Sequence, residues 1–236
     1  MDKPTNEHIV QIVGALITNS NIVGLDIDCS KLNATGVNAI TQLVKCNNWL
    51  QELCLKDLDV VIYRNFELEN INAISELFEA MKYNKAILRL GIRGQSLRDL
   101  LVVPIFKMMI VNDTVIELGI TWNDDKEEYQ EAFRNMLREN KTLRKLKIDS
   151  NGDLGSARNH ITRRIHALIP QIFPGILEAL NINGSLEFIE YTELVPMHPN
   201  AIYNVLNRNR HNARLREMTL EERCKAISII PKYHIK

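Results

Sequence analysis

Apolar residues recur along this chain with two periods, first that of a helix and then that of a strand. In MLRENKTLRKLKIDSN (136–151), the first residues continue an apolar helical face that begins at Phe133. The helical pattern stops at Asn140, a residue type that tolerates the left-handed conformation that ends many helices. From Leu146 to Ile148 apolar and polar residues alternate, as in a half-buried strand. The stretch therefore predicts a helix, a stop at Asn and a strand.

This unit recurs along most of the chain. Six asparagines are each followed by apolar residues three and six positions later and by Ile, Leu or Tyr at the eighth position, and each is preceded by apolar residues seven and three positions earlier. They are Asn19, Asn47, Asn84, Asn112, Asn140 and Asn183. Three of the intervals are 28 residues, and the other two, of 37 and 43 residues, fit a unit with an insertion. A seventh, incomplete unit ends at Asn209 and has no strand pattern after it. A strand-plus-helix period of this kind indicates a repeat array, in which each unit buries its apolar stripe against its neighbours.

The repeat also resembles a known family. Its L-x-x-L-x-L spacing is similar to leucine-rich repeats of the ribonuclease-inhibitor type, and MLRENKTLRKLKIDSN and LVKCNNWLQELCLKDL resemble the C-terminal repeats of tropomodulins. The likeness covers roughly residues 9–194. It implies an α/β leucine-rich repeat solenoid, with a curved parallel β-sheet on the concave side and helices on the convex side. The chain departs from the family after the strand, where the usual Asn is replaced by Ser30, Leu58 and Gln95 in three units.

Helices are expected near 8–18, 36–46, 71–83, 98–111, 126–139, 172–182 and 199–208, each but the last followed by a strand. Residues 1–208 then form one array of about six to seven units, with insertions near 57–70 and 149–171. A capping box at Thr219 and Glu222 predicts one more helix. We therefore expect residues 209–236 to form a C-terminal helical cap.

Composition and motifs reduce the number of function classes that fit the sequence. The formal net charge is +0, with 29 basic and 29 acidic residues, so no bulk charge recruits nucleic acid or an anionic membrane. No segment reaches the roughly 20 apolar residues of a membrane span. The four cysteines have no paired metal-ligand spacing, which favours reduced thiols and a cytoplasmic location. The six histidines lie in no catalytic or zinc motif, and there is no phosphate-binding loop, so we expect neither an enzyme nor a metal or other cofactor.

Partner binding is expected on the strands of the concave side. In each repeat the residues five, seven and nine positions after the Asn should face solvent between the inward apolar residues. The partner-binding candidates at these positions are Asp26, Asp28, Lys56, Arg89, Arg93, Lys145 and Lys147, with Trp122 just beyond one strand. Their charge pattern could steer a complementary protein, or they could be solvated strand residues without a partner.

Two clusters of arginines offer other surfaces. Arg163 and Arg164 belong to the 149–171 insertion, whose basic cluster spans 158–164 and which is either a binding element or a charged solvent-facing helix. A second cluster at 208–216 could contact phosphate or an acidic protein, or cap the carbonyls of the final helix.

The sequence thus favours a non-enzymatic scaffold that binds a protein partner through the concave strand face or the 149–171 insertion. The alternatives are an RNA- or phosphate-headgroup-binding protein that uses the two Arg clusters, an actin or cytoskeleton regulator by analogy with tropomodulin, and a bacterial effector that acts in the cytosol of a host cell. Self-association is a further hypothesis, because an uncapped N-terminal repeat could stack on another copy. Fold analogy alone does not choose among these roles.

Overall fold

The computed structural model describes residues 3–58, 61, 68–94, 99–121, 126–149, 177–191 and 200–217, and within them the helix–strand unit repeats as expected. The helices are α1 (Asn6–Leu16), α2 (Ala34–Cys46), α4 (Leu68–Tyr83), α5 (Asp99–Val111), α6 (Glu127–Glu139) and α8 (Asn200–Glu217), with a further helical segment at 177–182. The strands are β1 (Gly24–Asp28), β2 (Glu52–Lys56), β3 (Arg89–Arg93), β4 (Glu117–Thr121), β5 (Lys145–Asp149) and β6 (Phe188–Tyr191).

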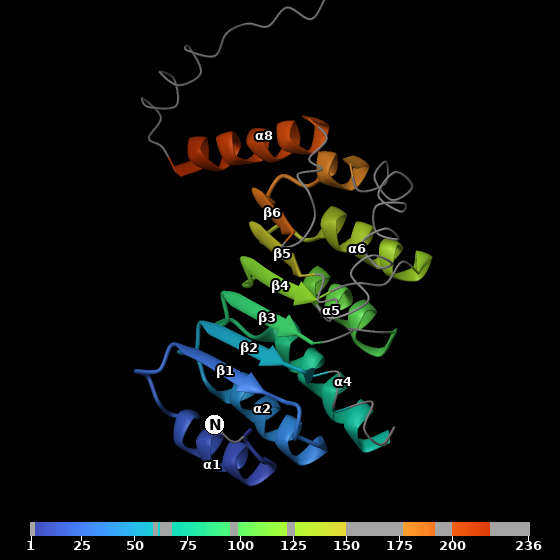
Figure 1. The fold of residues 1–236 in the computed structure, drawn as a ribbon. Helices are drawn as coiled ribbons and strands as arrows, with labels where there is room; N and C mark the ends of the chain where they lie inside the picture. The colour runs from blue at the N-terminus through green and yellow to red at the C-terminus, as the bar shows by residue number, and fades with distance from the viewer. Residues whose placement is uncertain are drawn as a thin grey trace, which may run out of the picture.

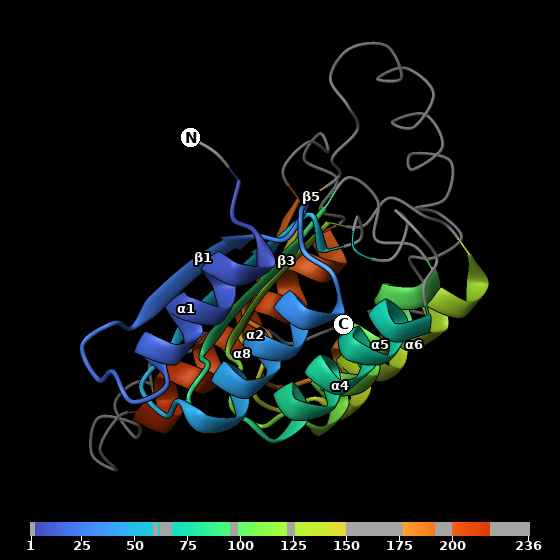
Figure 2. The same cartoon turned by 90° about the horizontal axis from the view of Figure 1, so that it is seen from below.

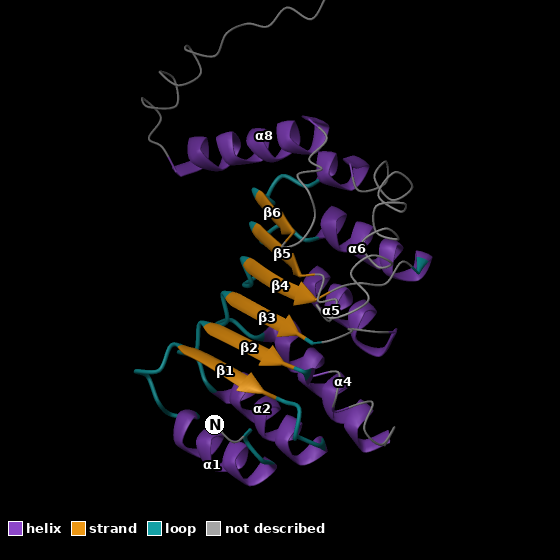
Figure 3. Ribbon diagram, in the orientation of Figure 1, coloured by secondary structure: helices purple, strands orange, loops and turns teal. Residues whose placement is uncertain are grey.

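The strands form one parallel sheet in the order of the sequence, β1-β2-β3-β4-β5-β6 (Figure 1). The helices α2, α4, α5 and α6 stack beside the sheet as a second layer, which is seen from below in Figure 2 and coloured by secondary structure in Figure 3. The chain is therefore an α/β leucine-rich repeat solenoid, as the periodicity predicts.

The register of the sheet matches the spacing from each asparagine. Positions six residues after successive asparagines pair directly across the strands, in the column Leu25, Leu53, Leu90, Leu118, Leu146 and Ile189. The apolar residues eight positions after each Asn form a second column, which is buried from Ile27 to Ile148. These columns pack against the helix residues seven and three positions before each Asn, such as Phe133 and Leu137 of α6. Each repeat thus contributes one layer to a single continuous core.

Three helices, α1, α2 and α4, begin two or three residues earlier than the apolar periodicity predicts. Asn33 caps α2 by accepting a hydrogen bond from the Thr35 amide, and it lies three residues before the first predicted helical position. Thr5 and His8 form a capping box at the start of α1. The largest difference is α8, which continues to Glu217, so the predicted domain boundary after residue 208 falls inside a helix. The predicted cap spans 209–236, and its part beyond Glu217 lies outside the described residues, as does most of the 149–171 insertion.

The asparagine of each repeat does not adopt the left-handed conformation that we expected. Asn47 (φ −89°, ψ 125°) and Asn140 (φ −70°, ψ 129°) have extended backbones, so that expectation was wrong. Their recurrence in the unit instead reflects the side-chain amide. From Asn47 to Asn183 this amide is buried, and it ties each repeat both to itself and to the repeat before it.

Asn112 shows the arrangement. Its Oδ1 accepts hydrogen bonds from the amides of Thr114 (2.9 Å) and Val115 (2.8 Å), which fixes the turn into β4. Its Nδ2 donates to the carbonyls of Met81 (2.7 Å) and Asn84 (3.4 Å), which belong to the preceding repeat. Equivalent bonds from the side chain to the preceding repeat are made by Asn47, Asn84, Asn140 and Asn183. We call this column of side chains the asparagine ladder. It satisfies carbonyls at the end of one helix with a donor from the next repeat.

Candidate functional site: the open face of the sheet

The open face is the side of the sheet away from the helix layer, formed by the residues five, seven and nine positions after each ladder asparagine. Parallel pairing places equivalent residues of neighbouring repeats side by side on this face, so its chemistry can be followed one column at a time. The predicted candidates from β1, β2, β3 and β5 all stand in these columns.

The column five positions after the asparagines alternates in charge. Glu52, Arg89, Glu117 and Lys145 follow one another on adjacent strands, and each is paired in register with its neighbour of opposite sign. Arg89 forms an ion pair with Glu52 and lies 3.9 Å from Glu117. The column ends at Phe188 of β6, whose ring lies below the Lys145 ammonium at 5.5 Å. We call this column, together with Lys147, the charge ladder.

Glu117 is the centre of the charge ladder. Its carboxylate lies 2.7 Å from Lys147 Nζ and 3.8 Å from Lys145 Nζ, with Arg89 on its other side. Burial alone would raise the pKa of Glu117, but the hydrogen bond from Lys147 and the three positive charges outweigh it and lower this pKa. The carboxylate therefore stays ionised while its side chain is only 23% exposed.

A second group of charges lies at the β1 end of the face. Lys56 Nζ lies 2.6 Å from Asp26, diagonally across β1 and β2. Asp28 is bound by Lys3 at 3.3 Å and by the hydroxyl and amide of Ser30. Burial tends to raise the pKa of Asp28, yet the Ser30 hydrogen bonds and Lys3 lower it overall. The acid groups of β1 are therefore neutralised within the chain.

In the middle of the open face two strands carry glycine, which has no side chain. Gly91 and Gly119 occupy the seventh position on β3 and β4, beside Cys54 of β2. A Cβ atom at Gly91 would lie 2.9 Å from Cys54 Sγ, so a larger residue there would require the Cys54 side chain to move. Burial raises the pKa of the Cys54 thiol, which keeps it protonated. Like Cys29 and Cys46, it is a free thiol.

Seven of the ten predicted residues stand on the open face. Asp26, Asp28 and Lys56 lie at its β1 end, Arg89, Lys145 and Lys147 belong to the charge ladder, and Arg93 is exposed at the end of β3. Trp122, Arg163 and Arg164 lie outside the described residues. Sequence reasoning did not single out Glu52, Glu117 and Lys3 as members of the site. For the two glutamates the signal was present, because the fifth position alternates in sign from repeat to repeat.

Two arginines of the second cluster, Arg208 and Arg210, form hydrogen bonds within the fold. Arg208 donates to the carbonyls of Leu180, Asn181 and Asn183 at 3.4–3.5 Å. It therefore caps the helical segment 177–182. The expected use, capping the end of its own helix, is not what these hydrogen bonds do. Arg210 donates to the Glu187 carbonyl at 2.8 Å and lies over the Phe188 ring.

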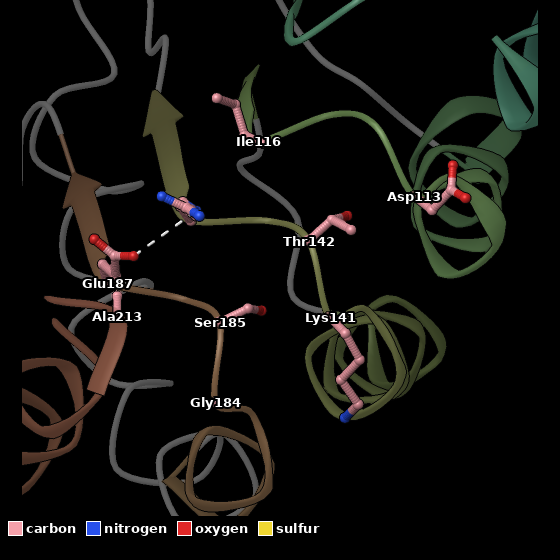
Figure 4. Close-up of a pocket in the computed structure, with 9 residues that line it drawn as sticks. Asp113, Ile116, Lys141, Thr142, Gly184, Ser185, Glu187 and Ala213 are labelled. Carbon is pink, nitrogen blue, oxygen red and sulfur yellow. Dashed lines mark ion pairs between the residues drawn. The ribbon is translucent and has the colours of Figure 1, made fainter. Parts of the chain in front are cut away.

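A hollow lies at the edge of the sheet where the chain enters β4, β5 and β6, outside the open face (Figure 4). Its lining includes Lys141, Thr142 and Ser185, and an ion pair of 3.9 Å joins Arg144 and Glu187. Its volume of ≈ 260 Å³ is below the roughly 300–1,000 Å³ of common small-molecule sites. Over the described ranges, no cluster of His, Cys, Asp and Glu could hold a metal ion. No helix in the described parts of the chain is long and apolar enough to cross a bilayer.

Comparison with known proteins supports the fold. No protein-family model matches the chain, and no curated protein sequence matches it. Among solved structures, the chain is similar to actin-binding site 2 of leiomodin-1, with a TM-score of 0.51 and 15% identity over 95% of this chain and 99% of that one. It also aligns with the tropomodulin C-terminal domain of Caenorhabditis elegans, with a TM-score of 0.40 and 12% identity over 90% and 98% of the two chains. The first likeness shows a shared fold.

Proposed function

We propose that this chain is a protein-binding module without enzymatic activity, and that the open face of the sheet is its contact surface. The observation that carries the proposal is the charge ladder. Four strands present alternating charges in register on a face that the helix layer leaves uncovered. Such a surface is broad, polar and shallow, which suits a protein partner better than a small substrate.

The charge ladder is better suited to recognising a partner than to stabilising the fold. Exposed ion pairs each contribute roughly 0–1 kcal/mol to folding, so these residues are not needed to hold the sheet together. On a binding surface, by contrast, charges of fixed sign and position select a partner of complementary pattern and reject others. The charges of this face are already paired within the sheet. A partner must therefore place a group of opposite charge next to each charge of the ladder, and a uniformly charged surface could not do this.

Actin is the first partner to test. The leiomodin-1 domain that shares this fold is described as an actin-binding site, and the tropomodulin-like pattern of the repeats motivates the same test. The RNA and headgroup alternative is less well supported, since Arg208 and Arg210 are engaged in hydrogen bonds within the fold.

The experiment compares two variants with the same change in charge. Arg89→Glu/Lys147→Glu reverses two cations of the charge ladder, whereas Lys45→Glu/Lys107→Glu reverses two exposed cations on helices α2 and α5. Binding to monomeric and filamentous actin is measured by fluorescence titration and co-sedimentation. We expect the ladder variant to bind at least tenfold more weakly and the helix variant to bind like the unmodified chain.

If the unmodified chain does not bind actin, the same pair is used in affinity purification from the native cell, with mass spectrometry of the recovered proteins. A partner recovered with the helix variant and lost with the ladder variant supports the open face as the contact surface. Equal recovery with both variants, at unchanged melting temperatures, would show that the partner binds elsewhere.

A further inference from the structure

The first repeat exposes apolar side chains at positions that are buried in the later repeats. Ile12, seven positions before Asn19, is 42% exposed, whereas its counterparts are buried at Ile40, Leu77, Ile105 and Phe133. Ile22, three positions after Asn19, is 43% exposed, while Leu50, Ile87, Val115, Leu143 and Leu186 are buried. The periodicity of the core therefore continues into a surface that no described residue covers.

Two more apolar residues close to these in the sequence are exposed. Val10 and Val23 are also exposed, and a Cβ added at Gly14 of α1 would meet nothing within 4 Å. We call Val10, Ile12, Ile22 and Val23 the N-terminal apolar face. Apolar side chains exposed at positions that are buried in the other repeats indicate an interaction site, because leaving them in water is unfavourable.

Backbone groups at this end are uncovered as well. β1 is the end strand of the sheet and pairs with β2, and no described strand pairs with its other edge. Asn19 fixes its own turn by accepting from the amides of Asn21 and Ile22, both at 2.9 Å. Within the described residues, it has no preceding repeat to receive its Nδ2 group. A partner here must therefore offer both apolar side chains and a strand edge.

A second copy of this chain meets these requirements. Edge strands commonly resist pairing through their charges, but Asp26 and Asp28 of β1 are neutralised by Lys56 and Lys3 of the same chain. The formal net charge is +0, so two copies do not repel each other at long range. The opposite end of the array is covered by α8, where Asn209 donates to the carbonyls of Asn183 and Leu186 (Figure 1).

Because α8 closes that end, head-to-tail stacking of copies is blocked there, and the copies must meet through their first repeats. We infer that two copies associate about a two-fold axis, with their N-terminal apolar faces in contact and their β1 strands antiparallel at the centre of one continuous sheet. In this arrangement both open faces lie on the same side of the dimer. The inference stands apart from the proposed function, since none of the four apolar residues belongs to the charge ladder.

The test is the mass in solution, measured by sedimentation equilibrium and by light scattering over a range of concentrations. A monomer has a mass of 27.1 kDa, and the unmodified chain should approach twice this value as concentration rises. Ile12→Glu/Ile22→Glu should remain a monomer with little change in melting temperature, because both side chains are already exposed. Trp49→Glu/Tyr83→Glu alters two other exposed aromatic residues and should still dimerise.

Two outcomes would overturn the inference. If the unmodified chain keeps the monomer mass at its highest soluble concentration, the apolar face is covered by something other than a second copy. If Ile12→Glu/Ile22→Glu dimerises as strongly as the unmodified chain, the copies meet through a different surface. Loss of actin binding in the ladder variant, with the dimer intact, would separate this inference from the proposed function.

Discussion

At the residue scale, Glu117 shows how the sheet register creates an electrostatic environment that no single repeat contains. Its three cationic neighbours come from β3 and β5, two repeats that are 56 residues apart along the chain at Arg89 and Lys145. Parallel pairing alone brings them to one carboxylate. The consequence is a lowered pKa and a contribution to stability that depends on pH.

The sign of this contribution follows from the direction of the shift. The pKa of Glu117 is lower in the folded chain than its ordinary value of 4.5, so the ion pairs stabilise the fold above that pH and are lost as the pH falls through the folded pKa. Glu117→Gln should therefore lower the free energy of unfolding at pH 7 by less than about 1 kcal/mol. The difference from the unmodified chain should shrink toward pH 3.

Urea unfolding at a series of pH values measures this difference, with Glu128→Gln on the exposed side of α6 as the control. The control should leave the acid dependence as it is in the unmodified chain. A loss of stability in Glu117→Gln that is the same at pH 7 and pH 3 would contradict the role of the carboxylate.

The ladder asparagines show where residue-level prediction succeeded and where it failed. The spacing of Asn140 from Leu143, Leu146 and Ile148 located the turn correctly, because apolar periodicity reports which residues are buried. It did not reveal the role of the Asn. A backbone preference for the left-handed region and a buried side-chain amide both select Asn at a helix end, and one repeat read alone does not separate them.

At the element scale, α8 differs from the other helices because it ends the array. Asn209 takes the ladder position and Arg208 adds a guanidinium beside it, bonded to Asn209 Oδ1 at 3.1 Å and to carbonyls of the preceding helical segment. The sequence suggested a boundary at residue 208 because the apolar pattern stops there. Backbone hydrogen bonds and polar side chains determine where the helix ends. Apolar periodicity reports only the buried face, so it does not locate this end.

We predict that Arg208→Ala lowers the free energy of unfolding by about 1 kcal/mol, because it removes the donor that caps the 177–182 segment. Arg214→Ala, four residues from Arg210 on the same helix and exposed, should change stability by less than about 0.5 kcal/mol. Chemical denaturation of both variants checks the prediction. Equal effects would mean that α8 holds the end of the array through its apolar contacts alone.

At the scale of the whole molecule, the register of the sheet and the continuity of the core could be predicted from the sequence. Both follow from a repeated spacing, and every pair in the column from Leu25 to Ile189 agrees with it. The pairing of charges on the open face could not be predicted with the same certainty, because it depends on side-chain reach between strands. The sequence indicated which charges stand on the face, and the structure adds that Asp26 and Lys56, Glu52 and Arg89, and Glu117 and Lys147 form ion pairs there.

The asparagine ladder joins each repeat to the one before it and so links the repeats into one body. Asn112→Asp tests this with almost no change in shape, because it replaces a buried donor by an acceptor that faces the carbonyls of Met81 and Asn84. Asn19→Asp is the matched control, since Asn19 keeps the same two acceptor bonds in its turn and has no described bond to a preceding repeat.

The most direct measurement is therefore the free energy of unfolding of these two variants by chemical denaturation at pH 7. We predict a loss of about 3 kcal/mol or more for Asn112→Asp, from unsatisfied groups in a buried site, and a loss below about 1 kcal/mol for Asn19→Asp. Equal losses in the two variants would contradict the asparagine ladder as a link between repeats, because the amide would then serve only the turn of its own repeat.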